Sequence, residues 1–91
     1  MNAVVIFDVN NPKQVRELMR AQGYATTWSS GEGEEKKIFN LPSNVVWKPN
    51  TELQKAYNDL VSIVAISGNK LERCMVLNST PWFGVVGFPV T

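Results

Sequence analysis

The chain has 91 residues, nine of them basic and eight acidic, and a formal net charge of +1. This length predicts one domain over residues 1–91, whose modest core would gain from further burial in an oligomer. A charge so close to zero excludes an overall polycation of the kind that binds nucleic acid, so a charged partner would need a local patch. Neither a membrane-spanning run nor the pattern of a secretory signal is found, which favours a soluble, cytoplasmic protein without membrane contact.

The first predicted element is a strand over Ala3–Val9, in which five consecutive apolar residues precede Asp8. A continuous apolar run of this kind is typical of a strand buried on both faces in the middle of a sheet. A carboxylate at the end of such a strand suggests chemistry or a structural use. Two alternatives stay open for Asp8: it binds a metal ion, or it accepts hydrogen bonds from the backbone amides that open the next helix.

A helix is predicted to follow. Asn11-Pro12 with Gln14 has the pattern of a capped helix start, and Gly23 is placed to end the helix in a left-handed conformation. Residues 24–29 and 37–41 are then predicted to be the two strands of a hairpin with a charged tip.

The second half begins with residues 42–49, which two prolines bracket and which we interpret as an edge or a structured loop. A second helix is predicted over residues 51–68, with Leu60 in the middle of its apolar stripe. Residues 71–77 are predicted to be a strand, and residues 82–90 an apolar extended tail.

This order of elements predicts an α+β fold, a ferredoxin-like βαββαβ sandwich with an additional C-terminal strand. Its sheet would have four antiparallel strands, with both helices on one face. The tail has no place in that sheet and would leave apolar side chains uncovered, so we expect a homodimer. The expected interface residues are Trp82, Phe83, Val85 and Phe88.

The chemical inventory of the chain is small. It contains no histidine, the commonest general base, and its single cysteine, Cys74, lies in an apolar run that predicts a buried structural thiol. Magnesium sites need few carboxylates, so two copies of Asp8 facing each other across a dimer axis would be able to hold Mg²⁺ or Mn²⁺.

Several basic and aromatic residues are candidates for binding nucleic acid. Lys13, Arg16 and Arg20 share one face of the first predicted helix and could bind phosphates, the alternative being an ordinary solvated face. Trp47 beside Lys48 is the aromatic candidate for a ligand surface, because exposed tryptophans can stack on bases.

Three short motifs carry a resemblance to a known family. Phe7-Asp8-Val9 at a strand end, Gly23-Tyr24 at a helix end, and Ser29 followed by Glu32-Gly33 resemble the second of the CRISPR-associated core proteins and the related virulence-associated protein D. The resemblance covers roughly the first third of the chain by motif. It implies a ferredoxin-like dimer whose last strand crosses to the partner, and for some members metal-dependent ribonuclease activity or binding of duplex DNA. It also implies that Asp8 corresponds to a metal-binding aspartate and Ser29 to a hydroxyl residue near the same site.

Two functions are therefore expected as alternatives. One is a metal-dependent nuclease, or a nucleic-acid-binding relative of one, that uses Asp8 across a dimer. The other is a non-catalytic dimeric module whose apolar tail and Trp47 loop bind a protein or a small ligand.

Overall fold

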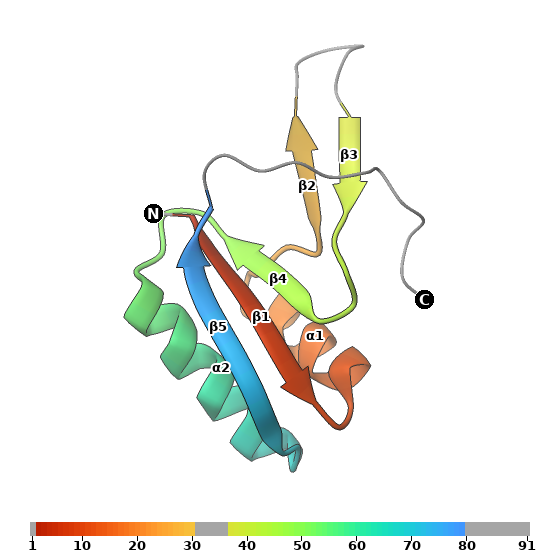
Figure 1. Ribbon diagram of the computed structural model, residues 1–91, viewed down its shortest axis with the longest axis vertical. Helices are drawn as coiled ribbons and strands as arrows, with labels where there is room; N and C mark the ends of the chain where they lie inside the picture. Colours follow the sequence, from red (N-terminus) through yellow and green to blue (C-terminus); the bar gives the residue numbers. More distant parts are fainter. Residues whose placement is uncertain (1, 31–36, 80–91) are drawn as a thin grey trace.

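The computed structural model describes residues 2–30 and 37–79, which form a small α+β fold (Figure 1). In chain order the elements are β1 (Ala3–Val9), α1 (Pro12–Ala21), β2 (Thr27–Ser30), β3 (Lys37–Asn40), β4 (Val45–Lys48), α2 (Leu53–Ser67) and β5 (Leu71–Asn78). β1 is the middle strand of a three-stranded antiparallel sheet in the order β4-β1-β5, and β2 and β3 form a separate two-stranded sheet.

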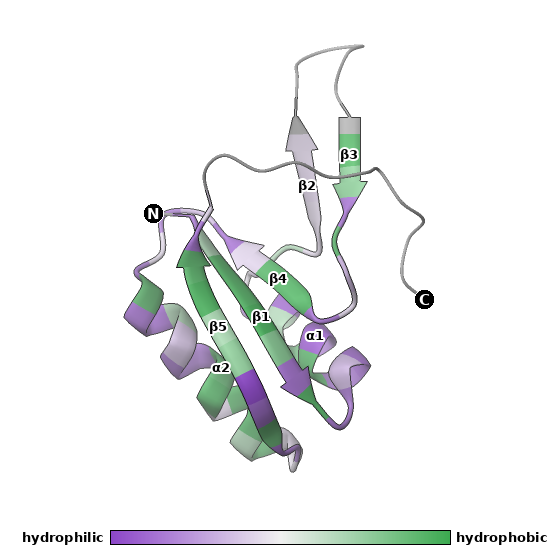
Figure 2. Cartoon of the chain, in the orientation of Figure 1, coloured by the Kyte–Doolittle hydropathy of each residue, from purple (hydrophilic) through white to green (hydrophobic). Residues whose placement is uncertain are grey.

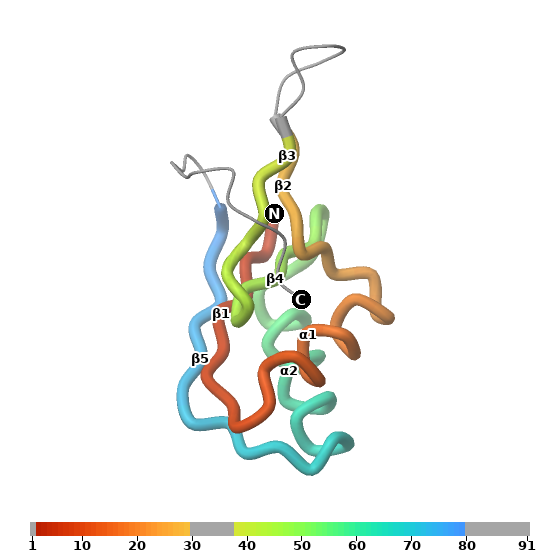
Figure 3. The backbone as a smooth tube through the Cα atoms, turned by 90° about the vertical axis from the view of Figure 1, so that its right-hand side faces the viewer, coloured from red at the N-terminus to blue at the C-terminus, as the bar shows by residue number. Residues whose placement is uncertain are grey.

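The two helices lie side by side on one face of the three-stranded sheet, so that this part of the molecule has two layers (Figure 3). The core lies between the layers and is formed by Ala3, Val5, Phe7, Val9, Val15, Met19, Tyr24, Val46, Ala56, Leu60, Ile63 and Val64. Alternate residues of β1 are buried in this core, as expected for a strand whose side chains point in turn to either face.

The expected four-stranded sheet is wrong, because the main sheet has three strands. The segment between the two prolines, interpreted from sequence as an edge or a structured loop, is the edge strand β4 and pairs with β1, from Ala3 opposite Lys48 to Ile6 opposite Val45. The hairpin strands β2 and β3 pair with each other instead of joining the main sheet.

A single backbone bridge marks the point where the chain entering β2 leaves the main sheet. The amide and carbonyl of Ala25 exchange hydrogen bonds with Trp47 of β4, at 2.7 and 3.1 Å. The pairing extends in neither direction. Pro49 has no N–H to donate, and on the other side the Val45 amide donates to the Pro42 carbonyl at 3.0 Å while the Thr27 carbonyl accepts a 2.7 Å bond from the Trp47 indole. β2 therefore turns away and pairs with β3.

The start of α1 confirms the predicted cap, and the capping residues also form hydrogen bonds to a distant loop. The Asn11 side chain accepts a hydrogen bond from the backbone amide of Gln14 at 3.2 Å. The Asn69 side chain accepts from the Asn11 amide at 2.9 Å and donates to the Gln14 side chain at 2.8 Å. These bonds join the β1–α1 connection to the α2–β5 connection, so both loops are held at one end of the sheet.

α2 has 15 residues and ends at Gly68, whose φ of +73° is the left-handed conformation that glycine adopts without steric cost. Its buried residues are Ala56, Leu60, Ile63 and Val64, which confirms Leu60 in the centre of the stripe. Within residues 2–30 and 37–79, neither helix is long and apolar enough to cross a lipid bilayer.

Candidate functional site

The face of the main sheet opposite the helices carries exposed and half-buried apolar side chains. Residues paired across an antiparallel ladder point to the same side, so the side chains that point away from the helices can be assigned from the register. We call this surface the outer face and define it by Val4, Ile6, Asp8, Val45, Trp47, Arg73, Met75 and Leu77. Figure 2 shows hydrophobic residues along most of β1 and β5, with a polar stretch near one end.

The outer face is only partly covered. Val4 and Ile6 of the central strand are half-buried, whereas Val5 and Phe7 on the helix side are fully buried. Met75, directly opposite Ile6, is 61% exposed. β1 is thus central, as expected, but the expected burial of both its faces is wrong for this chain alone, because both helices pack on the same side.

Asp8 lies at the polar end of the outer face and is paired with a cation. Its Oδ2 accepts a 2.9 Å hydrogen bond from Nε of Arg73 and a second bond from Nη2 of the same side chain. The β1–β5 ladder shifts register directly after this pair, between Asp8 and Val9. The helix-start role considered for Asp8 is wrong, since the side chain that caps α1 is that of Asn11.

The expected metal site is not assembled by this chain alone. In the described part of the chain, no three Asp, Glu, His or Cys side chains lie close enough to hold a metal ion. Ser29, matched with Asp8 by the resemblance, is an exposed residue of β2, and β2 lies beyond the opposite end of β1 from Asp8 (Figure 1). Asp8 and Ser29 therefore do not share a site within one copy.

Cys74 also differs from expectation, because it is exposed and not buried. β5 is an edge strand of the sheet, and its residues 72–75 are all exposed. An apolar run alone does not distinguish an edge strand from a central one, which explains the difference.

Trp47 and Lys48 both make contacts with other residues of the chain. The Trp47 ring packs against Trp28 with centroids 4.0 Å apart, and its indole N–H donates to the Thr27 carbonyl. Lys48 donates to the Gln22 carbonyl at 3.0 Å, and its Nζ lies 5.3 Å from the centre of the Tyr24 ring. The Trp28–Trp47 pair joins the hairpin to β4, so stacking on a base would have to use the remaining exposed surface of Trp47.

A buried tyrosine was missed by the sequence analysis. The Tyr24 hydroxyl donates a 2.8 Å hydrogen bond to Oδ2 of Asp59, which also forms an ion pair with Lys55. Burial of the phenol and the neighbouring Asp59 carboxylate both raise the pKa of Tyr24. Tyr24 therefore stays neutral and links the end of α1 to α2. This structural role depends on a contact between distant residues and could not be predicted from a short motif.

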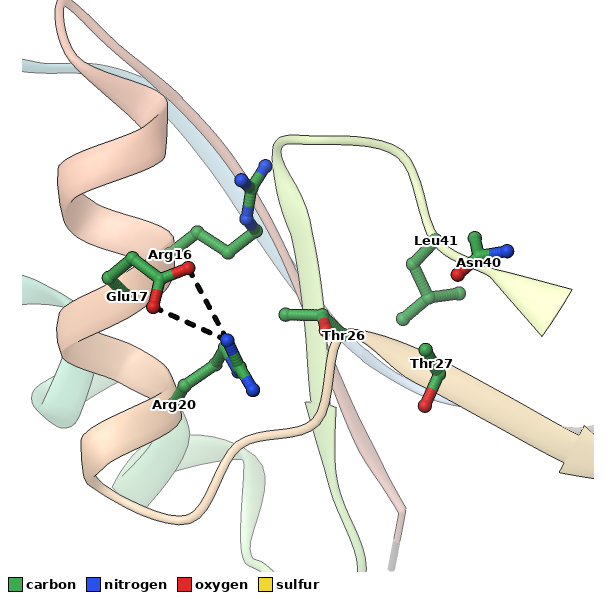
Figure 4. A pocket seen from close by; sticks show the side chains of 7 residues that line it. All are labelled: Arg16, Glu17, Arg20, Thr26, Thr27, Asn40 and Leu41. Atoms are coloured by element: carbon green, nitrogen blue, oxygen red, sulfur yellow. Dashed lines mark hydrogen bonds and ion pairs between the residues drawn. The ribbon is translucent and has the colours of Figure 1, made fainter. Parts of the chain in front are cut away.

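A pocket of about 190 Å³ lies between α1 and the base of the hairpin (Figure 4). It is lined by Arg16, Glu17, Arg20, Thr26, Thr27, Asn40 and Leu41. Figure 4 shows both arginines extending from α1 toward the strands, with the two threonines and Leu41 on the opposite side. Thr26, Thr27 and Asn40 were not expected, because nothing in their local sequence places them beside α1.

The three residues predicted to form a basic face on α1 differ in exposure. Lys13 and Arg20 are exposed, but Arg16, expected on the same solvated face, is only 5% exposed. Arg16 lines the pocket and donates from Nη1 to the Ser43 carbonyl at 3.3 Å. The structure thus brings together Arg16 and Arg20, and not Lys13, Trp47 or Lys48 with them.

The expected interface residues Trp82, Phe83, Val85 and Phe88 lie outside the described residues. In comparisons with known protein families, with curated proteins and with solved structures, no match to the chain was found, so the functional argument depends on its own geometry.

Proposed function

We propose that the protein is a non-catalytic dimeric interaction module in which a second copy of the chain covers the outer face. One observation carries the proposal: β1 has the composition of a strand buried on both faces, and the helices cover only one of them. A two-fold axis is the simplest arrangement, because the same surface of each copy then meets its equivalent.

The area of the outer face can be compared with the area that a stable dimer interface buries. β1, β4 and β5 have seven, four and eight residues. At about 3.4 Å per residue and about 4.8 Å between strands, their common face has an area of roughly 300 Å² per copy. A stable interface typically buries about 800 Å² per partner, so the sheet faces alone are too small. Residues 80–91 contain no charged side chain and include Trp82, Phe83 and Phe88, and they are the part of the sequence suited to supply the remaining apolar area.

The proposal includes a ferredoxin-like description of the fold. The order of helices and strands and the position of β1 between β4 and β5 support it. The Ala25–Trp47 bridge stands where a fourth strand would pair with β4. The hairpin would then be an extension of that strand pulled away from the sheet.

Truncation after Ser79 tests the contribution of the tail. We expect the full chain to be a dimer and the truncated chain to have the mass of one copy, because the truncation removes the apolar residues needed to complete the interface. Light scattering measures both masses, and circular dichroism controls for the fold of the truncated chain. A truncated chain that remains a dimer would show that the outer face suffices and that the tail has no part in assembly.

The second candidate function is a metal-dependent nuclease or a nucleic-acid-binding relative, and the position of Asp8 favours it. Asp8 lies on the outer face, so a dimer formed through this face would bring two copies of the carboxylate into its interface. Mg²⁺ or Mn²⁺ would be the matching ion. The Arg73 guanidinium opposes such a site, since it already neutralises the carboxylate and would have to move for a cation to bind.

Asp8→Asn separates the two candidates. For the interaction module, we expect no cleavage of RNA or DNA by the wild type with either ion. We also expect the variant to change the free energy of unfolding by about 1 kcal/mol or less, because the Asp8–Arg73 pair is largely exposed. Cleavage by the wild type that the variant abolishes would instead establish the nuclease.

A further inference from the structure

We infer that the pocket between α1 and the hairpin base is a binding site for a phosphodiester. This inference concerns the pocket lined by Arg16, Arg20, Thr26 and Thr27, and it does not depend on the proposed dimer.

The first observation is a buried cation, Arg16, that forms no ion pair with a carboxylate of the described residues. Arg16 is 5% exposed, and among residues 2–30 and 37–79 its guanidinium donates a single hydrogen bond, to the Ser43 carbonyl. A guanidinium has five N–H donors in a planar fork. No side-chain nitrogen or oxygen of the described residues is both buried and without a hydrogen-bond partner, so the Arg16 donors that do not bond to Ser43 remain accessible. The pocket therefore holds donors suited to an anion.

The second observation is the set of groups around that cation. Arg20 enters the pocket from one turn further along α1, and Thr26 and Thr27 line it from the facing segment (Figure 4). The guanidinium forks of Arg16 and Arg20 suit the several oxygens of a phosphate. A volume of about 190 Å³ equals roughly six water molecules, enough for a phosphate with part of its ester groups.

The third observation is the charge balance, which selects among phosphates. Glu17 lies in the pocket and forms a 3.3 Å ion pair with Arg20, so the described residues bring two positive charges and one negative charge to the cavity. The remaining single positive charge matches a phosphodiester, which carries one negative charge. The Arg20–Glu17 pair is about half exposed on both sides and therefore weak, so an incoming phosphate can compete for Arg20.

Exposed charge variants test the site without disturbing the core. Binding is measured by isothermal titration of the full chain with a dinucleotide. We expect Arg20→Gln to weaken binding by about tenfold through the loss of a charge-assisted donor. We expect Glu17→Gln to strengthen it by about twofold to fivefold, because the competing carboxylate is removed.

Matched controls come from the exposed Lys70–Glu72 pair beside the α2–β5 connection. Lys70→Gln and Glu72→Gln make the same changes in net charge as the two pocket variants, and neither should alter the affinity. Arg16→Lys keeps the buried charge but loses the fork, and we expect it to weaken binding even where the fold is retained.

A ten-residue single-stranded oligonucleotide and inorganic phosphate complete the test. If the oligonucleotide binds much more tightly than the dinucleotide, and Arg20→Gln weakens both, the natural source is a nucleic-acid backbone. Similar affinities that respond to the same variants indicate a small phosphodiester. The inference would be overturned if the dinucleotide did not bind. It would also be overturned if the pocket variants and their charge-matched controls changed the affinity equally, or if inorganic phosphate bound more tightly than either ester.

Discussion

Replacing Leu60 by alanine is expected to lower the free energy of unfolding by about 2–5 kcal/mol. Leu60 is fully buried and lies in the middle of the face of α2 that packs on the core. The substitution removes buried apolar area and leaves a cavity between the helices and the sheet, which the rigid sheet behind it cannot fill. Denaturant unfolding followed by circular dichroism measures the change.

Val61→Ala is the matched control for this experiment. Val61 is the next residue of α2 but is 39% exposed, so the loss of two methyl groups there should cost less than about 1 kcal/mol. A Leu60→Ala variant that costs no more than this control would mean that the packing of α2 described above is wrong.

Met75→Glu is expected to convert the proposed dimer into a monomer while leaving the fold of each copy intact. Met75 is 61% exposed in one copy, so the new carboxylate stays in water as long as the chain is alone. In a two-fold dimer through the outer face, both copies carry the substitution, so the interface receives two negative charges. An unpaired charge in an apolar interface is strongly unfavourable. We expect the dissociation constant of the dimer to rise by about a hundredfold or more, which analytical ultracentrifugation measures.

Ile66→Glu is the control for a general effect of an added charge. Ile66 is 82% exposed and belongs to α2, in the layer on the other side of the sheet. This variant should keep the mass of the wild type. If both variants dissociate, or neither does, the interface lies elsewhere.

Local patterns in the sequence predict the elements whose residues act within a few positions of one another. Asn11 caps α1, Gly23 and Gly68 follow the two helices with positive φ, and Leu60 is central in α2, as expected. Each of these depends on hydrogen bonds or spacing inside one turn of chain, which is the information that a short sequence window contains.

Pairing between distant segments was harder to predict. β4 has only four residues between two prolines, and its place beside β1 depends on a ladder with residues about forty positions away. Where β2 leaves the sheet, the Trp47 indole donates to the Thr27 carbonyl and the Val45 amide donates to the Pro42 carbonyl, contacts that propensities do not encode.

The candidate sites divide in the same way. Lys13 and Arg20 are exposed on α1, as an amphipathic pattern predicts, but Arg16 is buried and its guanidinium donates to the carbonyl of Ser43, 27 residues away. Asp8 was identified as unusual from its place at a strand end, whereas its partner Arg73 is 65 residues away and carries no local signal. Residues that meet only after folding therefore had to be found in the structure.

The most direct test of the central claim is the mass of the full chain in solution, measured by sedimentation equilibrium over a series of protein concentrations. The account predicts twice the mass of one chain, because the outer face of β1 has to be covered by a second copy. The mass of a single chain at every concentration would contradict it.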